Sequence, residues 1–446
     1  MSLRISRSTR HFAFALAATT FIGIAVPAAA QTPPQKPCVA PLGWWESKGL
    51  MPFFVKPGGP APQNNCDFQL WSWSAMVHFM QPNPKTVAPL FLSLPVYDDL
   101  VSDKSGITAL KSLPPVHTLA LRPRNAQPKS LGSFKQAGPG GVLGDQNGRA
   151  VYYATHMDLG YFNFTQTYFG PNAYKKAAPT LNYPVGATVI KSSWRIVAPN
   201  ETVTDAYTTT ATIALLESDG KGKLQASGKT QGGVKVALVG VHVVGVLNDH
   251  PEFSWATFEH LNNAPDLPPD GDPNSPNPVS AQSYTFYKGG TPANASNHMA
   301  KTMTIDPASQ VIAPVTNVFQ QFQYGGATPP TRIVDIDSIN ANFMGKIKEQ
   351  KPTVIDPVFA NYRLTGTLWM LPNTLKPGDG GMDEEAIGSI DLDNATLETF
   401  VQGEGANCFM CHTTAGHGTA YPGKNINTSH IITSVIKPDP AIQKAR

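Results

Sequence analysis

Proline and glycine set the strongest limit on how this chain can fold, because together they interrupt the sequence too often for long helices. The 446 residues include 41 prolines and 38 glycines. Proline removes a backbone N–H and clashes with a helix interior, and both residues favour turns. The sequence therefore predicts a mainly β body with a few short helices, which is an α+β protein.

The clearest predicted strand covers residues 234–246, where β-branched residues occupy nearly every second position. Residues 248–251 (Asn-Asp-His-Pro) then form a turn, and residues 253–258 form the return strand of a hairpin. A loop is expected at residues 262–297, which are rich in Pro, Asp, Asn and Ser. Further strands are predicted at residues 187–197, 207–216 and 362–371.

Three segments have apolar residues at helical spacing, at residues 67–79, 338–349 and 395–402. In the third segment, Asn394 is placed to cap the first turn and Gly403 to end the helix. This helix would lead the chain directly to a pair of cysteines. We expect a body over residues 31–390 and a short C-terminal helical and loop segment over residues 391–446 that packs on it.

The first thirty residues have the pattern of a secretory signal peptide. Three arginines and no acidic residue precede an apolar run at residues 12–26, and three alanines end at Ala30. The alternative, a membrane anchor, needs about 20 apolar residues. We therefore predict a signal peptide at residues 1–30, a periplasmic or secreted mature protein, and no membrane-spanning segment after cleavage.

The charge balance argues against a nucleic-acid partner. The chain has 34 basic and 31 acidic residues, and three of the basic residues fall in the predicted signal peptide. The mature protein is therefore close to neutral. Nucleic-acid-binding proteins usually cluster Lys and Arg on one face, which this sequence does not suggest.

The four cysteines fall into two pairs. Cys38 and Cys66 lie near the start of the mature chain. In an oxidising compartment such a pair favours a structural disulfide over two free thiols. This disulfide would hold the N-terminal segment on the body.

The second pair belongs to the pattern Cys408-Phe-Met-Cys411-His412, which is typical of c-type haem attachment. Two thiols separated by two residues can bond to the two vinyl groups on one edge of the porphyrin. The adjacent histidine then lies under the iron as the proximal ligand. The sequence predicts one covalent haem c held by these three residues.

Three other sites could use the same cysteines. A redox dithiol normally follows a strand and opens a helix, whereas a glycine-containing stretch at residues 403–407 precedes this pair. A zinc site needs further ligands, and only His417 and His430 follow nearby. A plain disulfide is the third alternative. The predicted export supports haem, because stable c-type attachment goes with an extracytoplasmic protein.

The same region resembles a known group of proteins. Residues 394–402 leading into residues 407–412 resemble the closing segment of exported bacterial proteins grouped only under the name cytochrome c family. Residues 250–265 are similar to their central signature, and residues 68–79 to their Trp-rich N-terminal helix. The resemblance implies a mono-haem protein with a large non-haem body, and it implies no particular reaction. Its only residues with an implied role are the three of the attachment pattern.

The haem-bearing segment offers few candidates for the sixth iron ligand. All methionines lie at or before Met410, so the distal methionine of small class I cytochromes is absent from its usual place. His430, at the start of a predicted short helix over residues 429–436, is one candidate for the distal ligand. A residue of the body, such as one from the helix of Met76, His78 and Met80, is the second. An open iron position is the third.

These possibilities define the expected function. We expect electron transfer through the haem, which requires a redox partner protein that the sequence does not identify. The alternatives are a peroxidase-like or oxidase-like haem enzyme with an open distal site, or a haem-based sensor or binding protein.

The region around the predicted hairpin contains a second polar cluster. His250, Glu252, Glu259, His260 and His242 could form a metal site or face the haem. Glu259 and His260 are adjacent in a strand and therefore point to opposite faces. We interpret the cluster as polar residues of a structural hairpin.

Overall fold

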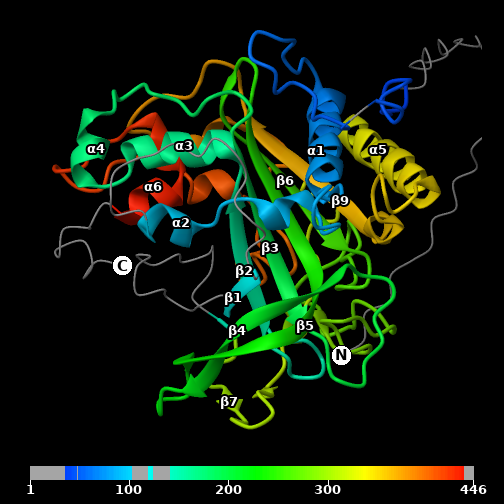
Figure 1. The fold of residues 1–446 in the computed structure, drawn as a ribbon. Helices are drawn as coiled ribbons and strands as arrows, with labels where there is room; N and C mark the ends of the chain where they lie inside the picture. Colours follow the sequence, from blue (N-terminus) through cyan, green and yellow to red (C-terminus); the bar gives the residue numbers. More distant parts are fainter. Residues whose placement is uncertain (1–35, 48, 103–118, 124–140, 436–446) are drawn as a thin grey trace, which may run out of the picture. The chain divides into compact units, whose positions relative to one another are not determined.

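A long β-hairpin forms the centre of the computed structural model, which describes residues 36–47, 49–102, 119–123 and 141–435 (Figure 1). β5 (Leu224–Leu247) pairs with β6 (His250–His260), and Leu247 lies opposite His250. Asn248 and Asp249 form the connection, and Asp249 has a φ of 59°. Asn and Asp tolerate this left-handed conformation, which tight hairpin turns require. The predicted hairpin is confirmed, although β5 begins ten residues earlier than expected.

Eight strands form one mainly antiparallel sheet in the order β10-β9-β6-β5-β3-β2-β1-β4. Its only parallel pair among the described strands is β1 with β4. β4 also pairs with the first half of β5, so that β5, β3, β2, β1 and β4 form a closed ring of pairings. The bounds of these strands are Leu119–Pro123 (β1), Val151–Met157 (β2), Thr188–Ile196 (β3), Thr208–Ser218 (β4), Tyr362–Met370 (β9) and Ala386–Gly388 (β10).

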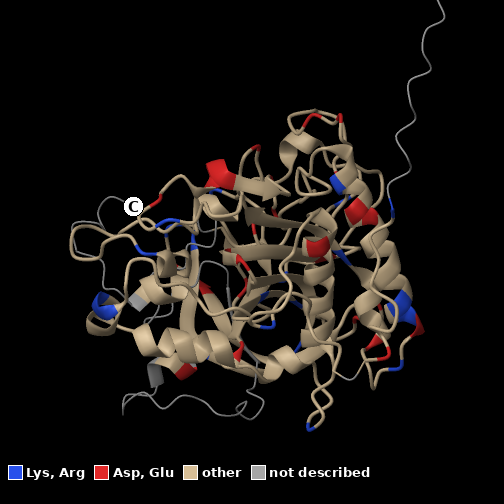
Figure 2. Cartoon of the chain, turned by 90° about the horizontal axis from the view of Figure 1, so that it is seen from above, with Lys and Arg blue, Asp and Glu red and all other residues tan. Residues whose placement is uncertain are grey.

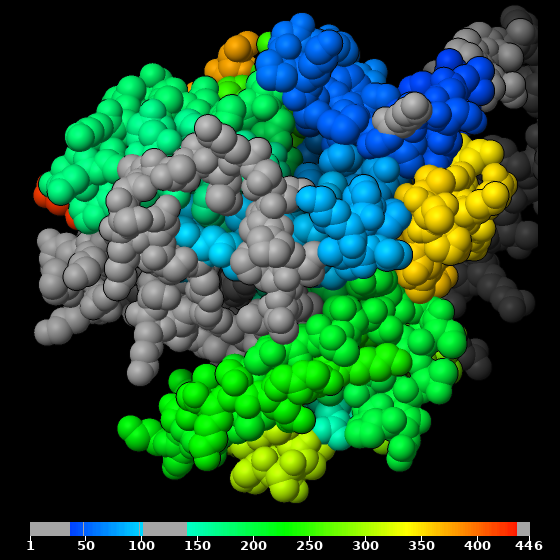
Figure 3. Space-filling model, viewed as in Figure 1, coloured from blue at the N-terminus to red at the C-terminus, as the bar shows by residue number. Residues whose placement is uncertain are grey.

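The strands predicted from the sequence correspond to β3, β4, β5, β6 and β9, and the mainly β, α+β class is confirmed. A separate two-stranded sheet consists of β7 (Thr304–Ile305) and β8 (Ile312–Ala313). The outer part of the β4–β5 pair is exposed, and Figure 3 shows it projecting in green at the lower side of the molecule.

Two helices cover one face of the sheet, α1 (Asn65–Met80) and α5 (Pro330–Glu349) (Figure 1). Both were expected, but α5 begins eight residues earlier than predicted, at a proline that fits the first turn of a helix. Trp71 and Trp73 of α1 are completely buried in the core on this face. The hydroxyl of Ser72 lies 2.6 Å from the hydroxyl of Thr367 in β9, which connects α1 to the sheet.

The other face of the sheet is covered by α3 (Leu159–Tyr168), α4 (Pro171–Lys176), α6 (His430–Val435) and the C-terminal segment (Figure 1). α6 agrees with the short helix predicted over residues 429–436. The remaining helices are α2 (Tyr97–Ser102) and the 3-10 helices Leu90–Ser93, Ala293–Ala295, Pro357–Asn361, Met382–Glu385, Cys408–Met410 and Asn425–Thr428.

The helix predicted at residues 395–402 is wrong, because this stretch consists of turns. Asn394 caps the first turn as expected, with its side-chain oxygen accepting the backbone N–H of Leu397. The carbonyl oxygen of Thr396, however, accepts the hydroxyl of Tyr153 in β2 at 2.7 Å. Contacts with the sheet therefore replace the hydrogen bonds that a continuing helix would form.

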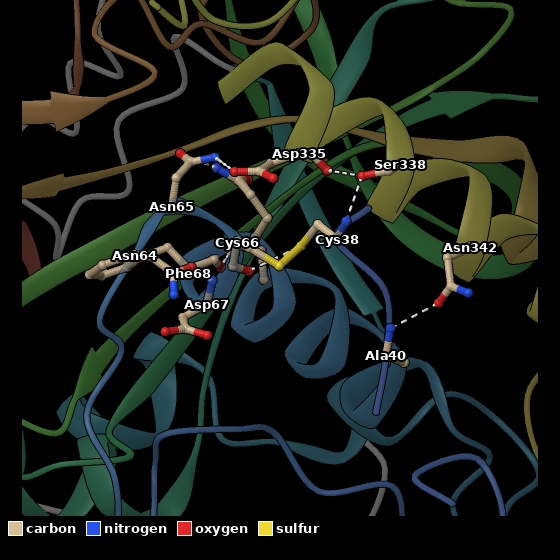
Figure 4. Close-up of a disulfide and its surroundings, with 12 residues drawn as sticks. Cys38, Ala40, Asn64, Asn65, Cys66, Asp67, Phe68, Asp335, Ser338 and Asn342 are labelled. Carbon is tan, nitrogen blue, oxygen red and sulfur yellow. Dashed lines mark hydrogen bonds between the residues drawn. A yellow bond between two sulfur atoms is a disulfide. The ribbon is translucent and has the colours of Figure 1, made fainter. Parts of the chain in front are cut away.

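The disulfide between Cys38 and Cys66 is present, which confirms the prediction (Figure 4). It joins the N-terminal segment to the first turn of α1, with the two Cα atoms 5.5 Å apart. The same segment is held to α5, because the N–H of Cys38 donates to the hydroxyl of Ser338 and the N–H of Ala40 to the side chain of Asn342. Asp335 lies close to the sulfur atoms, but both are engaged in the disulfide and neither can act as a thiolate ligand.

The described residues from Pro37 onward belong to one compact unit. In the part of the chain that the structure describes, no helix combines the length and the apolar composition needed to cross a membrane. Figure 2 shows acidic and basic residues interspersed over the molecule. The predicted signal peptide at residues 1–30 lies outside the described residues.

Candidate functional site

Two rows of side chains on one face of the sheet form the floor of the site. Pairing between β3, β5 and β6 places Val189, Val244 and Trp255 side by side. Lys191 and His242 form the next row, because they are also direct cross-strand partners. Residues two apart in a strand share a face, so the rows are adjacent. The sheet thus places one lysine and one histidine beside an apolar surface.

The attachment residues lie above this floor, where Cys408 begins a short 3-10 helix, Cys408–Met410, and Cys411 and His412 follow it directly. The side-chain oxygen of Asn407 accepts the N–H of Phe409 and caps this helix. Phe409 is completely buried, with its ring edge-on to that of Trp255. The buried phenylalanine therefore anchors the turn that carries the two cysteines. Both cysteines are free thiols, so a disulfide between them is not formed.

A cavity of about 410 Å³ separates the C-terminal segment from the sheet. Cys408, Cys411 and His412 all border it, and Lys191 and His242 border it from the sheet. The volume lies within the range of about 300–1,000 Å³ that is usual for small-molecule and cofactor sites. The structure therefore brings the three residues of the attachment pattern to one cavity.

The ring of His412 is oriented by the main chain. Its Nδ1 lies 2.8 Å from the carbonyl oxygen of Thr428. A carbonyl oxygen only accepts hydrogen bonds, so Nδ1 carries the proton and Nε2 keeps its lone pair. Burial, followed by the neighbouring His430, lowers the pKa of His412 well below its ordinary value, which keeps the ring neutral. A neutral imidazole with Nδ1 bonded to a carbonyl is the usual form of a metal-binding histidine.

The two thiols are also held in their neutral form. Burial is the main cause that raises the pKa of Cys408 well above its ordinary value, and the nearby carboxylate of Glu398 adds to it. Partial burial, followed by the charge of Glu398, also raises the pKa of Cys411, although part of this residue is exposed. Redox-active cysteines instead have lowered pKa values that favour the thiolate. The site does not favour the redox dithiol that was one alternative.

His430 and His417, the candidates for completing a zinc site, do not join the cysteines. Among the described residues, no ligand atoms form a compact group of three or more with the sulfurs of Cys408 and Cys411. His417 is half-buried. The Nε2 atom of His430 is engaged with the carbonyl oxygen of Cys411 at 2.9 Å.

The position of His430 also bears on its predicted role as distal iron ligand. Its ring stacks on the ring of His412, with the centroids 3.8 Å apart and an interplanar angle of 17°. A distal ligand approaches the iron from the face opposite the proximal ligand. The stacked arrangement places both rings together, so it does not favour His430 as the distal ligand, and this role stays a prediction.

A polar group lies on the cavity wall, and it combines His242, which the sequence placed among residues that could face the haem, with Glu398 and Lys191, which no sequence motif indicates. Nε2 of His242 lies 3.0 and 2.9 Å from the two carboxylate oxygens of Glu398. The ammonium of Lys191 lies 3.7 Å from the same carboxylate. The only sequence signal for this group is that Lys191 and His242 each lie in the middle of a predicted strand. Their proximity to Glu398 depends on strand register and on how the C-terminal segment folds back.

The other polar residues of the hairpin do not gather into one site. His250 pairs with Glu252, with Nδ1 2.8 Å from the carboxylate. Glu259 accepts the N–H of Ala395, whereas His260, on the opposite face, contacts the carbonyl oxygen of Asp205. Their contacts are local and structural, and of the whole cluster considered above only His242 borders the cavity.

Comparison with known proteins adds no assignment. The chain matches no protein-family model, no curated protein and no solved structure. The resemblance to the cytochrome c family therefore stays an expectation from the sequence, and the function has to be inferred from the site.

Proposed function

We propose that this protein is an exported mono-haem c-type cytochrome. Cys408 and Cys411 would hold the haem through thioether bonds, and His412 would be the proximal iron ligand. The observation that carries the proposal is that these three side chains border one cavity of about 410 Å³ above the sheet. Sequence spacing alone required them to be close together, but not to face a space of cofactor size.

The chemistry of attachment suits the neutral thiols. Each thiol adds its S–H across one vinyl group, so that sulfur bonds to one carbon and the proton goes to the other. This addition needs no oxidant or reductant. The role of the protein is to present Cys408 and Cys411 on one short turn, which Asn407 and the buried Phe409 hold in place.

The apolar part of the cavity wall also fits a cofactor. Val189, Val244 and Trp255 border the cavity from the sheet, and an apolar surface of this kind suits the flat ring of a porphyrin. When bound, the haem would supply one-electron chemistry, with iron alternating between its ferrous and ferric forms.

The surface next to the cysteines supports electron transfer to a partner protein. Cys411 is exposed, and Met410 beside it is 54% exposed. The edge of a haem attached there would therefore lie close to the surface. We propose that a redox partner docks at this edge, since electron exchange requires a short path between the two redox centres.

The proposed location outside the cytoplasm rests on two features. Residues 1–30 have the pattern of a signal peptide. The Cys38–Cys66 disulfide is of the kind that persists in the periplasm or outside the cell. Stable attachment of haem c also belongs to such compartments.

A second function, a haem enzyme, is favoured by one observation. His242, Glu398 and Lys191 provide acid and base groups on the cavity wall. Peroxidase-like chemistry needs such groups beside an open iron position. A haem enzyme with an open iron position would be high-spin in its ferric form and would bind small anions such as azide. These two properties would distinguish it from an electron-transfer protein.

The proposal is tested by producing the full chain in a bacterium that contains the c-type haem attachment machinery. We expect the periplasmic fraction to contain the protein with one haem c per chain, measured by the pyridine haemochrome spectrum. The matched control is the same chain without residues 1–30, which should remain in the cytoplasm without covalent haem. Periplasmic protein that is folded but colourless would contradict the proposal.

A further inference from the structure

The sixth position of the proposed iron site can be addressed through the histidines. Three of the described histidines border the cavity: His242, His412 and His430. The other described histidines do not border the cavity. Three of them contact a ring of the core on the opposite face of the sheet, namely His156, His250 and His260. His78 contacts the carbonyl oxygen of Gly49, His298 is exposed and His417 is half-buried. Since the ring of His430 stacks on His412, His242 is the histidine that borders the cavity from a different wall.

Methionine does not offer an alternative from the body. Among the described methionines, Met410 alone borders the cavity. It lies between the two attachment cysteines, on the same segment as His412, and is exposed. A side chain at that position cannot reach the face of the haem opposite the proximal ligand.

The surroundings of His242 suit a metal ligand. The ring is buried in β5, and Nε2 is bonded to the carboxylate of Glu398. Nδ1 has no hydrogen-bond partner among the residues that the structure describes. Metal-binding histidines usually bond one ring nitrogen to a carboxylate or carbonyl, which fixes the ring and increases the basicity of the other nitrogen. Lys191 balances the charge of Glu398.

We infer that His242 is the distal axial ligand of the haem iron, with Glu398 as the residue that positions it. This inference rests on the proposed function, because it requires haem at Cys408 and Cys411. Two histidine ligands give six-coordinate, low-spin iron, which exchanges electrons without binding a substrate. The site would therefore be that of a carrier.

The test uses the full chain with its haem attached. Electron paramagnetic resonance and optical spectra of the ferric wild type should show low-spin iron. His242→Ala should convert the spectrum to high-spin, and added imidazole should restore the low-spin form by occupying the vacated position. The control is His430→Ala, which removes the other non-proximal histidine bordering the same cavity and should leave the iron low-spin.

Several results would overturn the inference. These are a high-spin wild type, a low-spin His242→Ala variant without added imidazole, or conversion to high-spin by His430→Ala. If His242→Ala does not accumulate, near-infrared magnetic circular dichroism of the ferric wild type tests the inference instead. The spectrum should show the charge-transfer band of iron with two histidine ligands, and a band of another ligand pair would contradict the inference. Haem staining of the denatured wild type distinguishes failure of the proposed function from failure of the His242 inference. An unstained band contradicts covalent haem attachment and therefore the proposed function. A stained band, together with a spectrum that indicates another pair of iron ligands, contradicts only the role of His242.

Discussion

Gly240 in β5 and Thr396 in the C-terminal segment lie so close together that a Cβ atom on Gly240 would be 2.5 Å from the side-chain oxygen of Thr396. The hydroxyl of Ser193 would be 2.7 Å away. The hydroxyls of Ser193 and Thr396 are themselves 2.7 Å apart. The absence of a side chain at residue 240 therefore allows the C-terminal segment to rest directly on the sheet next to the proposed haem site.

Gly240→Ala should therefore destabilise the protein. Overpacking a tight interior contact costs about 1–3 kcal/mol, and we expect a loss of this size in the free energy of unfolding, measured by urea denaturation. The matched control is Gly232→Ala in the same strand, where the nearest atom to an added Cβ is 3.6 Å away. Equal stability of Gly240→Ala and wild type would contradict the close packing described here.

Asp158 should make stability depend on pH. Its carboxylate caps α3 and accepts the N–H groups of Tyr161 and Thr188 on one oxygen. Burial, only partly offset by these hydrogen bonds, raises its pKa to about 6. Because the pKa is raised above the unfolded value, the carboxyl group destabilises the folded state increasingly as pH rises from about 4 to about 6, by up to about 2 kcal/mol.

Asp158→Asn tests this dependence, since asparagine is an equally good cap and does not ionise. The free energy of unfolding of the variant, minus that of wild type, should increase by up to about 2 kcal/mol between pH 4 and pH 7. The difference at pH 4 is the internal control. A difference that is independent of pH, or that decreases as pH rises, would contradict the assignment.

The Cys38–Cys66 disulfide should stabilise the fold without affecting haem attachment. It closes a loop with a sequence separation of 28 and joins the N-terminal segment to α1. Replacing both cysteines by serine should lower the free energy of unfolding by about 2–5 kcal/mol. Urea denaturation of the double variant measures this, and its haem content should equal that of wild type. An unchanged denaturation midpoint would show that the disulfide is not a significant constraint.

Local patterns made parts of the fold predictable. The hairpin of β5 and β6 has clear alternation and a two-residue Asn-Asp turn, and both signals lie within one short stretch. β2 was missed because residues on both of its faces are buried, so the sequence Val-Tyr-Tyr-Ala-Thr-His-Met lacks alternation. The helix at residues 395–402 was predicted wrongly because Tyr153, more than 200 residues earlier, binds the carbonyl oxygen of Thr396.

The candidate site also has a part that local sequence predicts and a part that depends on long-range contacts. Cys408, Cys411 and His412 form a contiguous pattern, so they could be identified from the sequence alone. Lys191 and His242 become neighbours only through the register of β3 and β5. Glu398 reaches His242 across 156 positions of sequence, a contact that no periodicity or motif indicates.

Haem staining after denaturing gel electrophoresis tests the central claim most directly, because only covalently attached haem remains with the chain. Wild type and the Cys38→Ser/Cys66→Ser variant, both produced with the haem attachment machinery, should give a stained band. The Cys408→Ala/Cys411→Ala variant, loaded at equal protein, should give none. A stained band for this last variant, or an unstained wild type, would contradict the assignment of a covalent haem at these cysteines.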